Sequence, residues 1–225
     1  MAQRTLVAVL SLLIVVAAAP RVQNRPDIEK RTRDLLLVDY HHGFPYAEVH
    51  ALGRPAIPYI KAMLSSEANK KHWPNLVTAI GVISRESSFP YLRSLLLERF
   101  SGTVDEETFR TLASVPFSMG VLRTSDSLQI RDLLTRGADP AFWQRLRWQT
   151  VHFRDRGSLE YYFSKQCINA LGYSGSPSVG RTLEGMRARP RDPRQRLVIE
   201  SAIRTNDQIS HLGLEAYFRA GERAR

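Results

Sequence analysis

The sequence contains a single cysteine, Cys167, and only five lysines among its 225 residues. One cysteine excludes an intramolecular disulfide, so packing alone must stabilise the folded chain. The amino-terminal apolar run, Leu6–Ala19, is too short for an ordinary transmembrane helix, because it covers about 21 Å at ~1.5 Å per residue against a hydrocarbon core of ~30 Å. No segment shows sustained strand alternation bounded by hairpin turns, which predicts an all-α protein.

Arginine supplies almost all of the formal net charge of +10. Such a surface attracts anionic partners, for example acidic proteins, anionic polymers, lipid headgroups or nucleic acid. A GC-rich genome would produce the same excess of arginine without any functional meaning. Composition alone therefore leaves both explanations open.

The amino end resembles a secretory signal. Arg4 precedes the apolar run, which ends in small residues, so cleavage is expected near Ala18 or Ala19. Five basic residues follow the run, and positive charge there resists translocation. They are Arg21, Arg25, Lys30, Arg31 and Arg33. We expect an exported protein, periplasmic or extracellular, with a signal peptide over residues 1–19; the alternative is an uncleaved membrane anchor, the one case in which the chain contacts a membrane.

Helical stripes recur along the rest of the chain. Each stripe has apolar or small residues at i, i+3, i+4 and i+7, the spacing of one helix face. The two clearest are Leu76, Ala79, Ile80, Ile83 and Cys167, Ala170, Leu171, Ser174, and each is followed by a short polar turn and a second stripe. A repeated pair of helices therefore organises the chain.

Further copies of the pair have recognisable starts. The tetrapeptide Ile57–Ile60 (IPYI) matches Phe89–Leu92 (FPYL), with proline where the first turn of a helix tolerates it. Asp192 and Pro193 begin the last copy, where the aspartate can cap free N–H groups. A weaker copy runs from Phe109 through Leu134, and Pro116 is expected to kink or end its first helix.

These segments resemble HEAT repeats of the short variety found in phycobilisome-lyase-like proteins. The resemblance rests on the opening at Asp192 and on a small–apolar–Gly close of the first helix. That close reads Ala51-Leu52-Gly53, Ala79-Ile80-Gly81 and Ala170-Leu171-Gly172. It implies an α-solenoid of about five helix pairs over residues 46–220, with a helix and loop over 20–45 and a basic tail over 221–225. Between Ala138 and Tyr162 the period is lost, so we expect an irregular insertion there.

The segment from Cys167 to Ser176 could also suggest chemistry. It holds the cysteine and a loop, Gly172-Tyr173-Ser174-Gly175-Ser176, close to the G-x-S-x-G pattern of hydrolases. The cysteine lies on the buried stripe, and the loop lacks the preceding strand of a nucleophile elbow. We therefore interpret the segment as an inter-helix turn.

Two other clusters are weak candidates for sites. His41, His42 and His50 could bind a transition metal, but no H-E-x-x-H pattern supports this. The segment Phe142–Arg156 interleaves aromatic residues with arginines, as nucleic-acid platforms do, yet an export signal argues against that function. We expect no catalytic residue, metal or cofactor, and consider a glycosylase-like or metal-dependent HEAT enzyme less favoured.

The candidate binding residues are basic. In stacked helix pairs the second helix usually lines the concave face, and a dense basic run, Arg187–Arg196, lies near the last pair. The predicted partner-binding residues are Lys61, Arg93, Arg131, Arg181, Arg187 and Arg191. The sequence thus predicts a scaffold that binds a protein partner, and the basic residues suit an acidic one. An anionic polymer or lipid headgroup is an alternative ligand, and nucleic acid is disfavoured.

Overall fold

The computed structural model describes residues 25–40, 44–84, 86–122 and 127–223. This part of the chain is mostly helical, which confirms the expectation of an all-α protein. No helix within it is long and apolar enough to cross a bilayer. The segment Leu6–Ala19 lies outside the described residues. The α-helices are α1 (Arg25–Leu36), α2 (Tyr46–Leu52), α3 (Ile57–Met63), α4 (Trp73–Ile83), α5 (Phe89–Leu97), α6 (Glu106–Gly120), α7 (Leu128–Gly137), α8 (Arg156–Gly172), α9 (Pro177–Ala188), α10 (Arg196–Leu212) and α11 (Leu214–Arg223).

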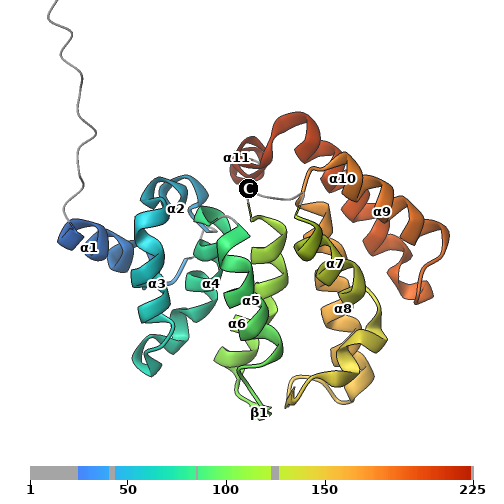
Figure 1. Ribbon diagram of the computed structural model, residues 1–225, viewed down its shortest axis with the longest axis horizontal. Coiled ribbons are helices and arrows are strands. Elements are labelled where there is room, and N and C mark those ends of the chain that lie inside the picture. The colour runs from blue at the N-terminus through green and yellow to red at the C-terminus, as the bar shows by residue number, and fades with distance from the viewer. Residues whose placement is uncertain (1–24, 41–43, 85, 123–126, 224–225) are drawn as a thin grey trace, which may run out of the picture.

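The helices follow one another across the molecule in chain order, from α1 to α10 (Figure 1). The even-numbered helices pack side by side, α2 on α4, α4 on α6, α6 on α8 and α8 on α10. Each odd-numbered helix from α3 to α9 packs on the even-numbered helix that follows it in the chain. We call these two sets the even layer and the odd layer. The apolar core lies mainly between them.

The predicted stripes form this core. Leu76, Ala79 and Ile80 are fully buried on α4, and Cys167 and Leu171 are buried on α8. Burial of such side chains contributes roughly 1.5–3 kcal/mol each for the larger apolar residues. The sequence pattern therefore identified the packed faces correctly.

Small residues let the helices of the even layer approach closely. At three successive helix contacts, a glycine of one helix faces a small residue of the next. The pairs are Gly81 with Ser118, Gly120 with Ala170, and Gly172 with Ala202. A Cβ atom on Gly120 would lie 2.3 Å from the carbonyl oxygen of Ala170, far inside van der Waals contact. The small–apolar–Gly close therefore marks a helix-to-helix contact at Gly81 and Gly172, and Ser118-Met119-Gly120 is a further copy of it. Gly53 differs, because it ends α2 with a φ of 66° and a Cβ there would meet only Pro55.

Proline and aspartate act largely as the sequence predicts. Pro58 and Pro90 lie in the first turns of α3 and α5. Asp192 accepts a hydrogen bond from the Arg194 N–H and forms a capping box with Gln195. Pro116, however, does not end its helix, since α6 continues to Gly120.

The irregular segment between α7 and α8 contains a short strand, which the sequence pattern did not indicate. Strand β1 (Gly102–Val104) pairs in parallel with β2 (Trp148–Thr150), with Gly102 opposite Trp148. The guanidinium of Arg156 donates to the carbonyls of Trp148 and Leu146, both at 2.8 Å. Arg156, at the start of α8, thus ties this segment down at the end of the molecule opposite α11 (Figure 1).

Helix α11 turns back over the middle of the row (Figure 1). It contacts α10 and also α2, at the other end of the even layer. The Phe218 ring stacks on Tyr46, with ring centroids 3.8 Å apart. Because α11 extends to Arg223, residues 221–223 of the expected basic tail are helical.

Candidate functional site

The segment around Cys167 forms the end of α8 and the turn to α9, as predicted. Cys167 is 2% exposed, and burial raises the pKa of its thiol, which disfavours the reactive thiolate. The loop after Gly172 joins α8 to α9, and Gly175 has a φ of 62°. The side chain of Ser176 accepts a hydrogen bond from the Ser178 N–H at the start of α9. These groups form a helix-to-helix turn rather than a nucleophile elbow.

The metal and nucleic-acid candidates gain no support. His41 and His42 lie outside the described residues, and no group of three or more potential ligands gathers within the described part of the chain. Trp143 and Trp148 are each 1% exposed, and their indole N–H groups donate to the carbonyls of Gly137 and Leu96. Indoles used in this way offer no stacking surface to bases, so Trp143 and Trp148 do not supply the aromatic platform that the sequence left as a disfavoured alternative.

The six predicted binding residues lie on or next to the odd layer. Lys61 on α3 has its Nζ 4.9 Å from the Tyr91 ring centroid of α5. Arg93 on α5 pairs with Glu98 at 2.9 Å. Both side chains therefore already have a contact partner within the protein.

The other four lie near α7 and α9. Arg131 on α7 donates to the Ser178 hydroxyl of α9 at 2.9 Å. Arg187 on α9 pairs with Glu184 at 2.7 Å, and Arg181 is exposed on the same helix. Arg191 lies in the loop after α9, 3.9 Å from Asp139. The six residues therefore share one side of the molecule but do not form a single continuous stripe.

Several arginines line one solvent-exposed cleft between α7 and α9. Its volume is about 1020 Å³. Arg136, Arg189 and Arg191 line it against a single carboxylate, Asp139. Phe142 and other uncharged residues line the rest of the cleft: Ala138, Ala141, Thr135, Thr182, Gly185, Met186, Pro190 and Gln195. We call this site the arginine cleft.

A second groove continues the positive surface. It lies between α5 and α7, has a volume of about 350 Å³, and shares Arg136 with the arginine cleft. Arg93 also lines it, opposite Asp132, which pairs with Arg136 at 2.8 Å. Arg145 stacks on the Phe142 ring at 3.6 Å. Partial burial, and then the charges of Arg136 and Arg93, lower the pKa of Arg145 from the ordinary guanidinium value.

The base of the arginine cleft is held firmly. Gln195 is 2% exposed, and its Nε2 donates to the Ala138 carbonyl at 2.7 Å and to the Ser164 hydroxyl at 2.5 Å. Its Oε1 accepts from the Asp192 N–H at 3.2 Å. These bonds fix the loop that carries Arg189 and Arg191 against the end of α7. The cleft is therefore a preformed feature of the fold.

The predicted binding set lacks four residues of this surface: Arg136, Arg189, Arg145 and Phe142. Arg189 appeared only within the basic run Arg187–Arg196, and Phe142 and Arg145 only within the disfavoured nucleic-acid segment. Arg136 lies at the end of α7, one turn beyond the stripe residue Leu133, and Phe142 and Arg145 lie in the irregular segment. A signal was present in the sequence, because Phe142 and Arg145 are three residues apart and could stack in one turn.

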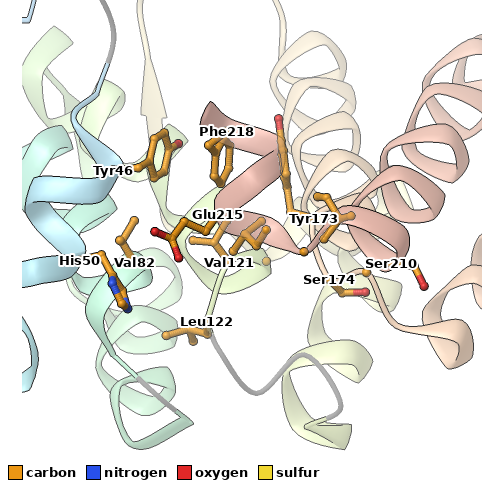
Figure 2. A pocket seen from close by; sticks show the side chains of 15 residues that line it. Tyr46, His50, Val82, Val121, Leu122, Tyr173, Ser174, Ser210, Glu215 and Phe218 are labelled. Atoms are coloured by element: carbon orange, nitrogen blue, oxygen red, sulfur yellow. The ribbon is translucent and has the colours of Figure 1, made fainter. Parts of the chain in front are cut away.

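A smaller cavity of about 270 Å³ lies beneath α11 (Figure 2). The rings of Tyr46, Tyr173 and Phe218 line one side of it, and Val121 and Leu122 line another. Its polar side chains are His50, Ser174, Ser210 and Glu215, and the Glu215 carboxylate points into the cavity (Figure 2). We call it the α11 cavity.

No protein-family model, no curated protein and no solved structure matches the chain. The function is therefore argued from the residues themselves.

Proposed function

We propose that the chain is a HEAT-type α-solenoid that works as a scaffold and binds the acidic segment of a protein partner in the arginine cleft. The repeated glycine contacts of the even layer support the solenoid, because they stack one helix pair on the next in the same way each time. The partner lies on the odd layer, the side of the row that the sequence analysis expects to be concave.

One observation carries the proposal: Arg136, Arg189 and Arg191 line one preformed cleft whose own wall has a single carboxylate, Asp139, while Arg136 also pairs with Asp132 beside the cleft. Like charges held together destabilise a fold slightly through repulsion, and an anionic ligand relieves that cost. Arginine also presents several donors in a planar fork that fits a carboxylate with two parallel hydrogen bonds.

The uncharged lining favours a protein segment over a bare polyanion. Phe142 and Met186 offer apolar surface beside the arginines. A peptide with carboxylates and at least one apolar side chain can use both features, whereas a polyphosphate or nucleic-acid backbone uses only the charge. The role is binding rather than catalysis.

We further propose that the scaffold works outside the cytoplasm, on the evidence of the amino-terminal sequence alone. The apolar run Leu6–Ala19 and the small residues that end it support export through a cleaved signal. The alternative remains an envelope factor that the same run anchors in the membrane.

The test is direct binding of a labelled peptide in which glutamates alternate with leucines, measured by fluorescence anisotropy at several salt concentrations. We expect the reversal set Arg136→Glu, Arg189→Glu, Arg191→Glu to weaken binding by more than tenfold. Charge screening should weaken wild-type binding as salt rises.

A matched control set, Arg31→Glu, Arg110→Glu, Arg204→Glu, makes the same change in net charge at exposed positions of α1, α6 and α10. If both sets weaken the peptide equally, binding follows net charge and the cleft is not the site. A single-stranded DNA or anionic lipid vesicle bound more tightly than the peptide would overturn the protein-partner assignment in favour of those ligands.

A further inference from the structure

The α11 cavity has an electrostatic character opposite to that of the whole protein. Four helices of the even layer end at it. Their residues in its wall are Val82 near the end of α4, Gly120 at the end of α6, Tyr173 just after α8 and Ser210 in the last turn of α10. The carboxyl end of a helix carries a partial negative charge of roughly half an electron, from carbonyls that have no partner in the helix. Four such ends at one cavity favour a cation.

A fifth helix end has the opposite sign. Helix α11 begins at Leu214, beside the cavity, and its amino end carries a partial positive charge. Glu215 in its first turn offsets that charge and points into the cavity (Figure 2). The cavity thus holds one carboxylate in addition to the four carboxyl ends of helices, and it also contains the His50 imidazole and Tyr46 from the amino end of the short helix α2.

Glu215 also has a partner on its own helix. Its Oε1 accepts a hydrogen bond from the guanidinium of Arg219 at 2.5 Å. Both side chains are about half exposed, and exposed pairs four residues apart on a helix are weak. A ligand cation can therefore share this carboxylate or displace Arg219 from it.

The rest of the wall suits an organic cation rather than a metal ion. Tyr46, Tyr173 and Phe218 give the wall aromatic surface, which attracts cations wherever a ring face is open to the ligand. Phe218 stacks on Tyr46 with ring centroids 3.8 Å apart, so the two faces in that contact are closed to a ligand. Val121 and Leu122 provide apolar surface for methyl or methylene groups. A volume of about 270 Å³ lies just below the range of roughly 300–1,000 Å³ typical of drug-sized ligands, so the ligand is small.

We propose that the α11 cavity binds a small organic cation, with its ammonium group near Glu215 and its apolar part against the aromatic rings. The cavity and the arginine cleft have no lining residue in common. The inference therefore stands apart from the proposed protein-binding function.

The test compares choline with 3,3-dimethylbutan-1-ol, which has the same shape but a carbon atom in place of the charged nitrogen. Binding to the whole protein is measured by isothermal titration calorimetry and by ligand-observed NMR. We expect choline to bind at least tenfold more tightly than the neutral alcohol. Equal affinities would show a purely apolar cavity, and no binding of either probe would overturn the proposal.

Three variants locate the cation. Glu215→Gln keeps the size of the side chain and should weaken choline at least fivefold. Arg219→Gln should strengthen choline binding, because it removes a competing cation from Glu215. The matched control Glu184→Gln on α9 removes a carboxylate that also pairs with a nearby arginine and should leave the affinity unchanged.

The same variants separate this proposal from the previous one. Glu215→Gln should not alter binding of the acidic peptide in the arginine cleft, and reversal of Arg136, Arg189 and Arg191 should not weaken choline. If Glu215→Gln leaves choline binding intact while circular dichroism shows a native fold, the assignment of the ligand to this cavity is wrong.

Discussion

Substitution of Gly120 by alanine should destabilise the protein strongly, although alanine is the better helix former. The new Cβ would lie 2.3, 2.8 and 2.9 Å from the carbonyl oxygen, carbonyl carbon and Cα of Ala170. All three are main-chain atoms of α8, so no side-chain rotation can relieve the clash. Since ordinary contacts lie at about 3.5 Å or more, α6 and α8 must move apart by about 1 Å.

The magnitude follows from two opposing contributions. Overpacking of a filled contact costs typically ~1–3 kcal/mol, and a main-chain clash belongs in the upper part of that range or above it. Alanine returns about 1 kcal/mol through its higher helix propensity. We therefore expect a loss of about 2 kcal/mol in the free energy of unfolding, which lowers Tm by about 4–8 °C for a domain of this size.

Urea denaturation followed by circular dichroism measures this loss, with two matched glycines as controls. Gly185 on α9 is exposed and has open space where a Cβ would lie, so Gly185→Ala should stabilise by about 0.5–1 kcal/mol. Gly172→Ala, whose nearest contact is 2.9 Å from Ala202, should cost less than Gly120→Ala. If Gly120→Ala is as stable as Gly185→Ala, the close contact of α6 with α8 does not exist as described.

Three further predictions concern single side chains. Cys167 should resist thiol reagents such as Ellman's reagent in the native state and react only at the rate of unfolding, because it is buried with a raised thiol pKa; rapid labelling without loss of circular dichroism would contradict this. Arg156→Ala should cost about 1–3 kcal/mol in urea denaturation, because carbonyls of the irregular segment lose their donor, whereas Arg156→Lys should recover only part of the loss; a neutral alanine variant would refute the role given to Arg156. The Lys70 side chain first, and then the bonds from Thr108, lower the pKa of Asp105 to about 2, so its stabilising effect is present above the unfolded value of ~3.9 and is lost as pH falls toward 2. Asp105→Asn should therefore reduce stability by less than about 1 kcal/mol at pH 7 and by clearly less near pH 2, where half of the carboxyl groups are protonated; an effect as large at pH 2 as at pH 7 would argue against the Lys70 pair.

The sequence predicted the helices and their buried faces well, because helical periodicity is a local property. Leu76 and Ile80 needed only their own neighbours in the chain to be assigned to the core. The proline starts of α3 and α5 were equally local, since a proline in the first turn removes no helical hydrogen bond.

Contacts between distant segments could not be predicted in the same way. Gly81 was recognised as part of a repeated motif, but its fit against Ser118 depends on how α4 lies on α6. The copy at Gly120 was missed, because Pro116 suggested that the helix would end earlier. The three-residue strands β1 and β2 are too short to leave a pattern, and their pairing joins segments far apart in the chain.

The candidate sites were predicted only in part. Positive charge on the odd layer followed from Arg93 and Arg191, but the cleft itself depends on the loop that Gln195 fixes. Trp143 and Trp148 belonged to the segment for which a nucleic-acid function was disfavoured, and the structure buries both of them in the core. The sequence contained no signal for the α11 cavity, because its wall combines residues from α2, α4, α6, α10, α11 and the loop after α8.

The stacking of Phe218 on Tyr46 changes how the row of helices can come apart. A linear array in which each unit contacts only its neighbours has two free ends, and unfolding can begin at either one without disturbing the other. Here α11 packs on both α10 and α2, so unfolding of one end removes contacts that stabilise the other end. We therefore expect α2 and α11 to protect each other and to unfold together rather than independently.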